Sequence, residues 1–305
     1  SLLRHAASCW LIAPTPKHMS AIPQIVHQTW RSRAVPRGLR SHIYSWKTVM
    51  PDWDHVFHTD ADNDALVASD YAWLLPTYRG MSAIQKADLI RYMYMHRFGG
   101  VYADLDVRLL QPLPALLASR NVSVLLGQEP LEHALLLERK PRQVCNAVLA
   151  SVPGHPFWLD VLREGGRGSR FGDPVGTTGP RMLERVVVRW ERERGQIAVL
   201  PPVAFYPTFD PMQMNTLRQR CRGSSFISVL DTDAMRAEAH AVCVRLRAHR
   251  FSPWVPSDGS AYTDHTWSHT WINGASKVDL WDQVPLRRGR RGKRHGADSA
   301  ETVEL

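Results

Sequence analysis

The sequence predicts an α/β fold in which a mainly parallel, mixed sheet is flanked by helices. Short apolar runs alternate along the chain with longer segments of helical periodicity, and this alternation is typical of layered α/β domains. With 305 residues, 44% of them hydrophobic and 22% charged, the chain has the size and composition to bury a sizeable core. It contains no internal repeat and no run of about 18 apolar residues that could cross a bilayer.

The strongest helix signal covers residues 82–98. Ser82 is a suitable N-cap, and Gln85 stands three residues later, as a capping box requires. The interior is rich in apolar side chains, and a Gly99-Gly100 pair follows it, as is common at helix C-termini. We therefore expect a well-formed helix here.

The other elements are expected from apolar runs, helical periodicity and the positions of proline and glycine. In order, we expect a strand at 22–30, a helix at 37–50, a strand at 54–58, helices at 60–69 and 71–78 with a break at Pro76, strands at 101–103 and 122–126, helices at 142–151 and 156–164, a glycine-rich loop at 165–177, a helix at 180–192, and strands at 197–200 and 242–246.

Three parts are expected along the chain. Residues 1–20 read as an irregular arm, because Pro14 and Pro16 oppose regular structure. Residues 21–275 form the folded domain, and 276–305 read as a basic, disordered tail. A basic tail of this kind either stays solvated or touches nucleic acid or anionic lipid. Six of the 38 basic residues, and so most of the net charge of +9, come from Arg287, Arg288, Arg290, Arg291, Lys293 and Arg294.

The four cysteines are Cys9, Cys145, Cys221 and Cys243. No two of them form a C-x-x-C pair, which argues against a zinc site. An even number permits disulfides, and Cys221 with Cys243 is a possible pair that spacing alone does not decide.

A pair of carboxylates follows the apolar strand at 101–103. Asp104 and Asp106 stand at i and i+2, so at a strand end both can reach one cation. Hard oxygen ligands suit Mg²⁺ or Mn²⁺, which in turn bind phosphate oxygens. The alternative is a pair of solvent-facing acids at a turn, but the position after Gly-Gly and a buried strand favours the metal site.

Asp88 and Arg91 lie at i and i+3 on the helix at 82–98 and therefore share a face. They form either an ordinary helix salt bridge or part of the same cleft as Asp104. In the second case Arg91 neutralises phosphate or orients Asp88, and Asp88 accepts hydrogen bonds from sugar hydroxyls. The local pattern leaves both interpretations open.

Two further segments are candidates for ligand contact. Gln28 and Trp30 stand at the carboxyl end of the first strand, the edge that lines the ligand crevice in α/β sheets, and could contact a nucleotide base. Trp30 could equally cap the core. Thr178 and Gly179 precede the helix at 180–192, where an anion or sugar contact is plausible.

Near the other end, the segment 264–271 carries two histidines between threonines and tryptophans. His265 or His269 could complete the coordination that the carboxylates begin. Their i, i+4 spacing also fits zinc on a helix, but the Thr and Trp content argues against a helix and no third ligand is near in sequence.

Together these segments resemble a known family. Residues 84–91, Ile-Gln-Lys-Ala-Asp-Leu-Ile-Arg, and 98–106, Phe-Gly-Gly-Val-Tyr-Ala-Asp-Leu-Asp, closely resemble the DXD sugar-transferring region of glycosyltransferase family 32. Residues 22–30 look like that family's first strand, and Thr178-Gly-Pro180 matches its mid-chain motif. His265-Thr-Trp267 and Trp271 look like its terminal His/Trp motif.

The resemblance implies a GT-A fold over 21–275, a divalent cation (Mn²⁺ or else Mg²⁺) and retention of the anomeric configuration. The family's terminal motif is often His-His-Trp, whereas this chain reads Asp264-His-Thr-Trp267, so the choice between His265 and His269 stays open. The implied catalytic residues are Asp88, Arg91, Asp104 and Asp106, the metal ligands Asp104, Asp106 and His265, and the donor-binding residues Gln28, Trp30, Asp88, Arg91, Tyr102, Asp104, Thr178, Gly179 and Trp271.

Within the family, the inositol-phosphorylceramide mannosyltransferases and the Golgi α-1,6-mannosyltransferases look most similar. They imply GDP-mannose as donor, a glycan or glycolipid acceptor, possible contact with a membrane surface, and a Golgi or other endomembrane lumen, or the cytoplasm if the chain is bacterial. A UDP-galactose or UDP-glucose transferase of the same fold is the alternative. A basic nucleic-acid-binding protein is a remote one, and no specific nucleic acid is expected.

Overall fold

The computed structural model describes residues 21–119, 123–168, 172–194, 197–223, 225–270 and 282–286, and the structural statements below concern these residues. Its centre is a sheet of six strands in the order β3-β1-β4-β7-β6-β8. Only β7 runs antiparallel to its neighbours, and the other pairs are parallel. The strands are β1 (Ile25–Thr29), β3 (Asp54–His58), β4 (Gly100–Ala103), β6 (Val124–Gln128), β7 (Val144–Ser151) and β8 (Ile197–Leu200). The predicted α/β fold with a mainly parallel, mixed sheet is therefore confirmed.

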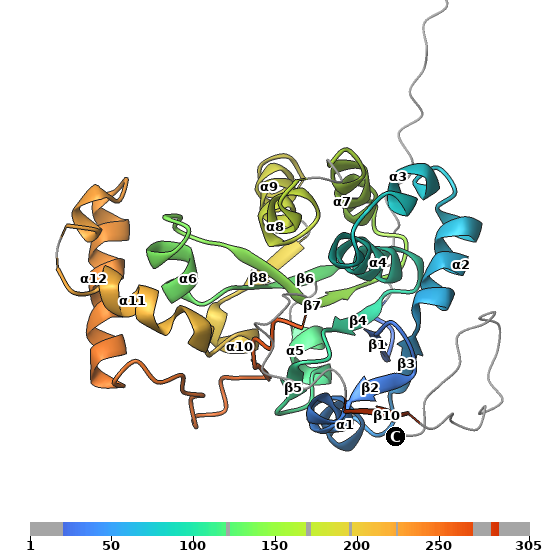
Figure 1. The fold of residues 1–305 in the computed structure, drawn as a ribbon, viewed down its shortest axis with the longest axis horizontal. Helices are drawn as coiled ribbons and strands as arrows, with labels where there is room; N and C mark the ends of the chain where they lie inside the picture. Colours follow the sequence, from blue (N-terminus) through green and yellow to red (C-terminus); the bar gives the residue numbers. More distant parts are fainter. Residues whose placement is uncertain are drawn as a thin grey trace, which may run out of the picture.

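Helices and short strands cover both faces of this sheet (Figure 1). Along β6, Val124 and Leu126 enter the apolar cluster under one layer of helices, and Leu125 enters the cluster on the opposite face. The first layer contains α4 (Ala83–Arg97), α7 (Pro156–Gly166), α8 (Pro174–Thr177) and α9 (Pro180–Glu193), with α2 (Asp60–Asp70) and α3 (Leu75–Arg79) at the β3 edge. The second contains α1 (Arg40–Val49), α5 (Pro114–Ser119), α10 (Pro202–Phe205) and the two-stranded sheets β2 (Ala34–Pro36) with β10 (Gln283–Pro285) and β5 (Val107–Leu109) with β9 (Thr263–His265).

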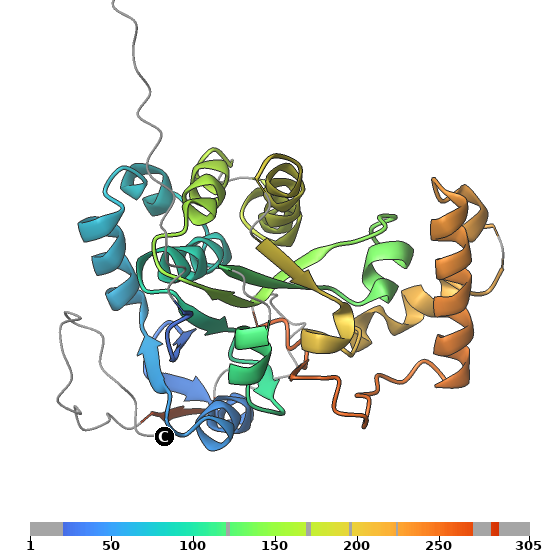
Figure 2. The same ribbon diagram turned by 180° about the vertical axis from the view of Figure 1, so that it is seen from behind.

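A third apolar cluster lies at the end of the molecule opposite α2 (Figure 2). It joins α6 (Leu131–Leu136), α11 (Met214–Arg220) and α12 (Asp233–Ala248). Cys221 and Cys243 form a disulfide between the end of α11 and the middle of α12, which confirms the pair that the sequence allowed. Cys145 is a free, buried cysteine.

Removing this disulfide should destabilise the protein substantially. The bond closes a loop with a sequence separation of 22 residues, for which chain entropy gives about 3 kcal/mol. We expect the double variant Cys221→Ser, Cys243→Ser to unfold at a clearly lower urea midpoint than the oxidised wild type. Reduced wild-type protein is the matched control and should behave like the double variant. Equal midpoints for all three samples would contradict the prediction.

The helix predicted at 82–98 is confirmed as α4. Ser82 is its N-cap, and the reciprocal bonds with Gln85 form the predicted capping box. The glycines after the helix have φ of 66° at Gly99 and 81° at Gly100. A Cβ at residue 100 would lie 2.5 Å from the carbonyl oxygen of Ile25, so only glycine lets β4 approach β1 here.

Two predicted elements are wrong. Residues 142–151 were expected to be helical, but Val144–Ser151 is strand β7, buried along its whole length. A strand buried on both faces shows no alternation, so its apolar run resembles a buried helix. Residues 242–246 were expected to be a strand, but they lie within α12. The buried residues of that helix, Met235, Ala239, Val242, Cys243 and Leu246, follow helical spacing.

The predicted tail also needs a correction. Residues Gln283–Pro285 pair with β2, and Leu286 is buried, so this part of the chain belongs to the folded domain. The N–H of Arg37 donates to the carbonyl of Asp282, and their side chains form an exposed ion pair. The arm at 1–20 and the cluster of basic residues after 286 lie outside the described residues.

Candidate functional site

A cleft of about 570 Å³ opens at the carboxyl ends of the parallel strands. Thr29 at the end of β1 and Trp30 directly after it line the cleft, as do Asp104 after β4 and Glu129 after β6. Because β7 runs antiparallel, its first residues reach the same edge, and Asn146 lines the cleft there. Helix α4 forms a wall with Asp88 and Arg91. The fold thus collects polar side chains from four strands at the edge where α/β proteins bind ligands.

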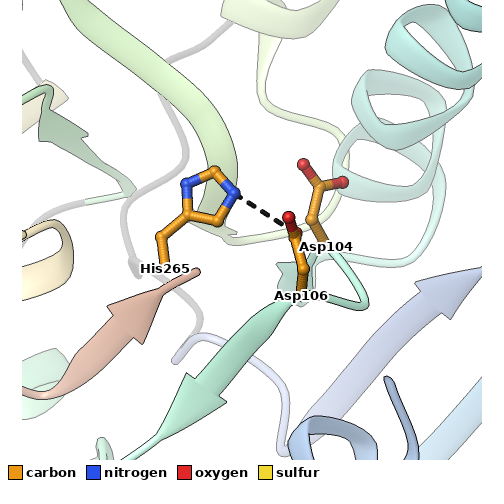
Figure 3. A group of neighbouring side chains, drawn as sticks. All are labelled: Asp104, Asp106 and His265. Carbon is orange, nitrogen blue, oxygen red and sulfur yellow. Dashed lines mark ion pairs between the residues drawn. The ribbon is translucent and has the colours of Figure 1, made fainter. Parts of the chain in front are cut away.

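Asp104, Asp106 and His265 form one cluster, in which a ligand atom of each lies within 4.8 Å of the others (Figure 3). The carboxylates follow β4, and the histidine ends β9. Strand β9 pairs with β5 so that His265 stands opposite Val107, next to Asp106. The imidazole Nε2 lies 3.2 Å from Oδ1 of Asp106. Two carboxylates and one imidazole within this distance are a donor set that can hold one divalent cation.

Ser268 orients the second carboxylate of this cluster. Its N–H and hydroxyl both donate to Oδ2 of Asp106, at 2.8 and 2.7 Å. Burial alone raises the pKa of Asp106, but His265 and Ser268 outweigh burial and lower it strongly. Burial lowers the pKa of His265, yet the nearby carboxylates outweigh it and raise the pKa. A cation bound here would therefore displace the imidazole proton, since only the neutral ring can be a ligand.

Arg91 connects α4 to the carboxylate cluster. Its Nη1 donates to Oδ2 of Asp104 and to the carbonyl of Asn146, each at 3.0 Å. Its Nη2 lies 3.4 Å from Oδ1 of Asp88. The guanidinium is buried, and Tyr102 packs on it and donates its hydroxyl proton to Oδ1 of Asp104. Asp88 and Arg91 therefore form the helix salt bridge that was one interpretation, but it is buried and lies at the cleft with Asp104, as the other interpretation had it.

Asp88 is held from the side away from the solvent. The Asn146 side-chain amide donates to its Oδ1, and the Thr178 hydroxyl donates to its Oδ2, each at 2.9 Å. Burial raises the pKa of Asp88 to about 6, against the charge of Arg91 and these two hydrogen bonds, which lower it. A carboxylate held this firmly at a cleft wall has a fixed orientation toward a ligand.

The structure brings some of the predicted residues together and not others. Trp30, Asp88, Arg91, Tyr102, Asp104, Asp106 and His265 line the cleft. Gln28 is buried within β1 and is not among the lining residues. Thr178 is fully buried and reaches the cleft only through Asp88, and Gly179 caps α9. His269 lines the cleft but pairs with Asp210 at 2.8 Å, and Trp271 lies outside the described residues.

Three residues of the site were not predicted. Ser268 lies inside the segment 264–271, but a serine carries no signal of its own. Asn146 was hidden by the wrong helix prediction, because only a strand places it at the cleft. Glu129 follows an apolar strand just as Asp104 does, and this parallel could have identified it.

Part of the cleft lies in a region that is similar to a known family. Residues 36–123 match the model of a family described as a glycosyltransferase sugar-binding region containing a DXD motif. The match covers Asp88, Arg91, Asp104 and Asp106, the residues that converge in the cleft. This part of the chain is therefore similar to the sugar-binding region of that family. Among the residues that the structure describes, no helix is long and apolar enough to span a membrane.

Several yeast proteins are similar to the chain. The chain is 29% identical over 216 residues to a mannosyl phosphorylinositol ceramide synthase of Saccharomyces cerevisiae, covering 67% of this chain and 53% of that protein. It is 31% identical over 181 residues to inositol phosphoceramide mannosyltransferase 3 of Schizosaccharomyces pombe, covering 57% and 47%. An initiation-specific α-1,6-mannosyltransferase of Candida albicans is 26% identical over 146 residues, covering 45% and 34%. The chain spans about half the length of the first two relatives.

Among solved structures, the PaToxG glycosyltransferase resembles the chain with a TM-score of 0.42 and 12% sequence identity. The likeness covers 75% of this chain and 87% of that chain.

Proposed function

We propose that the protein is a retaining, metal-dependent glycosyltransferase that transfers mannose from GDP-mannose to a hydroxyl of a glycan or of a glycolipid such as inositol phosphorylceramide. The observation that carries this proposal is the convergence of Asp88, Arg91, Asp104, Asp106 and His265 in one cleft of a protein that is similar to the DXD family over residues 36–123. The names of the similar yeast proteins, which are mannosyltransferases, support the choice of mannose.

The donor set of Asp104, Asp106 and His265 supports Mn²⁺ or Mg²⁺ as the metal. Bound there, the cation would act as a Lewis acid on the diphosphate and stabilise the charge that develops as it leaves. Asp106 has the most fixed orientation for binding the cation. Ser268 donates two hydrogen bonds to its Oδ2, and its Oδ1 faces His265.

The residues of α4 would position the donor sugar. Asn146, Thr178 and Arg91 hold the Asp88 carboxylate, which can then accept hydrogen bonds from sugar hydroxyls in a fixed geometry. Arg91 is buried and paired with Asp104, so its main role would be to orient these carboxylates. Trp30, at the end of β1, is placed to contact the nucleotide base.

The disulfide between Cys221 and Cys243 supports action in an oxidising compartment such as an endomembrane lumen, because reducing compartments rarely keep structural disulfides. A glycolipid acceptor would also place the protein at a membrane surface.

Donor turnover tests the proposal. We expect purified protein with Mn²⁺ to hydrolyse or transfer from GDP-mannose, and not from UDP-galactose or UDP-glucose, with EDTA abolishing the reaction. Asp106→Asn should lower turnover at least 100-fold, because it removes a charged ligand of the cation. Asp70→Asn is the matched control, since that carboxylate pairs with Arg97 outside the cleft. If no donor turns over and none raises the melting temperature with metal present, the proposal is wrong; turnover of a UDP-sugar would change only the donor.

A further inference from the structure

Glu129 is a cleft residue that the sites described so far do not use. It follows β6, and its N–H donates to the carbonyl of Gln143 at 2.7 Å, which places its backbone beside the start of β7. Asn146, the partner of Asp88, lies three residues further along that strand. The Glu129 side chain is 12% exposed and lines the same cleft as Asp88 and Asp106.

His133 fixes the orientation of the Glu129 side chain. Its Nδ1 lies 3.1 Å from Oε2 of Glu129, and its Nε2 lies 2.9 Å from the backbone N–H of Asp210. A backbone N–H can only donate, so Nε2 of His133 must be the acceptor nitrogen. The imidazole is therefore neutral with its proton on Nδ1, and it donates that proton to Glu129. The hydrogen bond that Glu129 receives from His133 therefore comes from a neutral group.

Other shielded glutamates of the protein are neutralised differently. Glu132 pairs with Arg245 at 2.9 Å, Glu138 with Arg181 at 2.6 Å, and Glu184 with Arg142 at 2.9 Å. Among the described residues, the Glu129 side chain forms no ion pair with an arginine or a lysine, and its side-chain hydrogen bond is to His133. The charges of Arg181 and His265 act on it without such a contact. Burying a carboxylate costs folding free energy. A carboxylate that is nevertheless kept in a cleft is a candidate for a functional role there.

We propose that Glu129 is a catalytic carboxylate that stabilises the positive charge developing on the donor sugar during transfer. This inference rests on the proposed function. In the order of the strands, the cleft is lined by Trp30 after β1, the metal cluster after β4, Asn146 on β7 and Glu129 after β6. A donor with its base at Trp30 and its diphosphate at the metal cluster extends its sugar toward Asn146 and Glu129.

The reaction balances without a proton transfer to Glu129. The bond between the anomeric carbon and the phosphate oxygen breaks, and its electron pair leaves with the diphosphate. The acceptor oxygen bonds to the anomeric carbon from the same face, and its proton passes to the departing phosphate oxygen. While the old bond is broken and the new bond incomplete, the sugar carries positive charge, and the fixed anion of Glu129 lowers the energy of that state.

The variant Glu129→Gln tests this role, because it keeps the shape and removes the charge. We expect kcat to fall roughly 100-fold, as for other losses of one charge-stabilising group. The KM for the donor and the affinity for GDP with Mn²⁺ should stay within about threefold, since the role is specific to the transition state. Glu132→Gln, which removes a shielded carboxylate that pairs with Arg245 and does not line the cleft, is the control and should keep its kcat.

The possible results separate this inference from the proposed function. If the wild type turns over a donor and Glu129→Gln keeps more than a third of its kcat, the role of Glu129 is wrong and the transferase remains. If the wild type turns over no donor, the proposed function itself fails. A glycosyl group found covalently bound to Glu129 by mass spectrometry would overturn the electrostatic role in favour of a nucleophile. Glu129→Asp keeps the charge but moves it back by one methylene, so its kcat should lie between those of the wild type and Glu129→Gln. An intermediate kcat would show that the loss in Glu129→Gln is not caused by misfolding.

His133 is a positioning residue in this scheme. His133→Asn keeps an N–H donor near the place of Nδ1, whereas His133→Leu keeps the bulk and removes the donor. We expect the Asn variant to retain most of the wild-type kcat and the Leu variant to lose at least tenfold, with donor KM little changed in both. Equal kcat values for the two variants would show that the hydrogen bond to Glu129 does not matter.

Discussion

Replacing Arg91 by methionine should both destabilise the protein and abolish its activity. The guanidinium is buried between two carboxylates, with Nη1 3.0 Å from Asp104 and Nη2 3.4 Å from Asp88. Its loss removes the arginine that forms an ion pair with both acids. Breaking a buried ion pair by removing one partner typically costs about 3–5 kcal/mol. The carbonyl of Asn146 would also lose a donor.

Urea unfolding of Arg91→Met beside Arg97→Met measures this effect. Arg97 is on the same helix, but its pair with Asp70 is largely exposed, so its replacement should cost well under about 1 kcal/mol. Adding Asp88→Asn to Arg91→Met removes one uncompensated charge and should recover part of the lost stability. If Arg91→Met is no less stable than Arg97→Met, the buried network contributes nothing to folding, and its importance would have to be purely catalytic.

The parts of the site that the sequence predicted are those built from local signals. Helix α4 has its cap, its apolar interior and its terminal glycines within residues 82–100, and Asp104 and Asp106 follow directly. Once the helix is predicted, the relative position of Asp88 and Arg91 follows, because their i and i+3 spacing places them on one face. No knowledge of distant contacts is needed for any of these inferences.

The contacts of the site that local sequence signals do not determine depend on pairings between distant segments. His265 reaches Asp106 only because β9 pairs with β5, more than 150 residues earlier in the chain. Asn146 reaches Asp88 because β7 is a central antiparallel strand, and a strand buried on both faces has no periodicity to distinguish it from a helix. Such pairings are determined by the packing of the whole sheet, and they cannot be predicted from the local sequence.

Acid should destabilise this protein well above the pH at which most carboxylates titrate. His27 and His58 lie in contact inside the fold, with Nδ1 of one 3.1 Å from Nε2 of the other, and both rings stack near Tyr94. Burial lowers the pKa of both histidines. At His27 the charge of His58 lowers it further. At His58 the charge of Arg33 adds to burial, and the pKa falls to about 3. Burial also lowers the pKa of His55 and of His155 to about 4.

The sign of the pH dependence follows from these shifts. Between the folded pKa and the ordinary value near 6.5, the unfolded chain binds a proton that the folded chain does not. The free energy of unfolding therefore falls as the pH drops below about 6.5, by up to about 1.4 kcal/mol per pH unit for each such histidine. The loss continues until the folded pKa is reached, which for His58 is about 3.

The slope of unfolding free energy against pH, measured between pH 6 and 4.5, isolates this contribution from any change in packing. We expect His58→Gln to reduce that slope by close to one proton, even if the variant is less stable at every pH, because glutamine does not titrate. His240→Gln, on the exposed side of α12, should leave the slope unchanged. An unchanged slope in His58→Gln would mean that the buried histidine pair is protonated in the folded state. A positive charge would then lie among the stacked rings of His27, His58 and Tyr94.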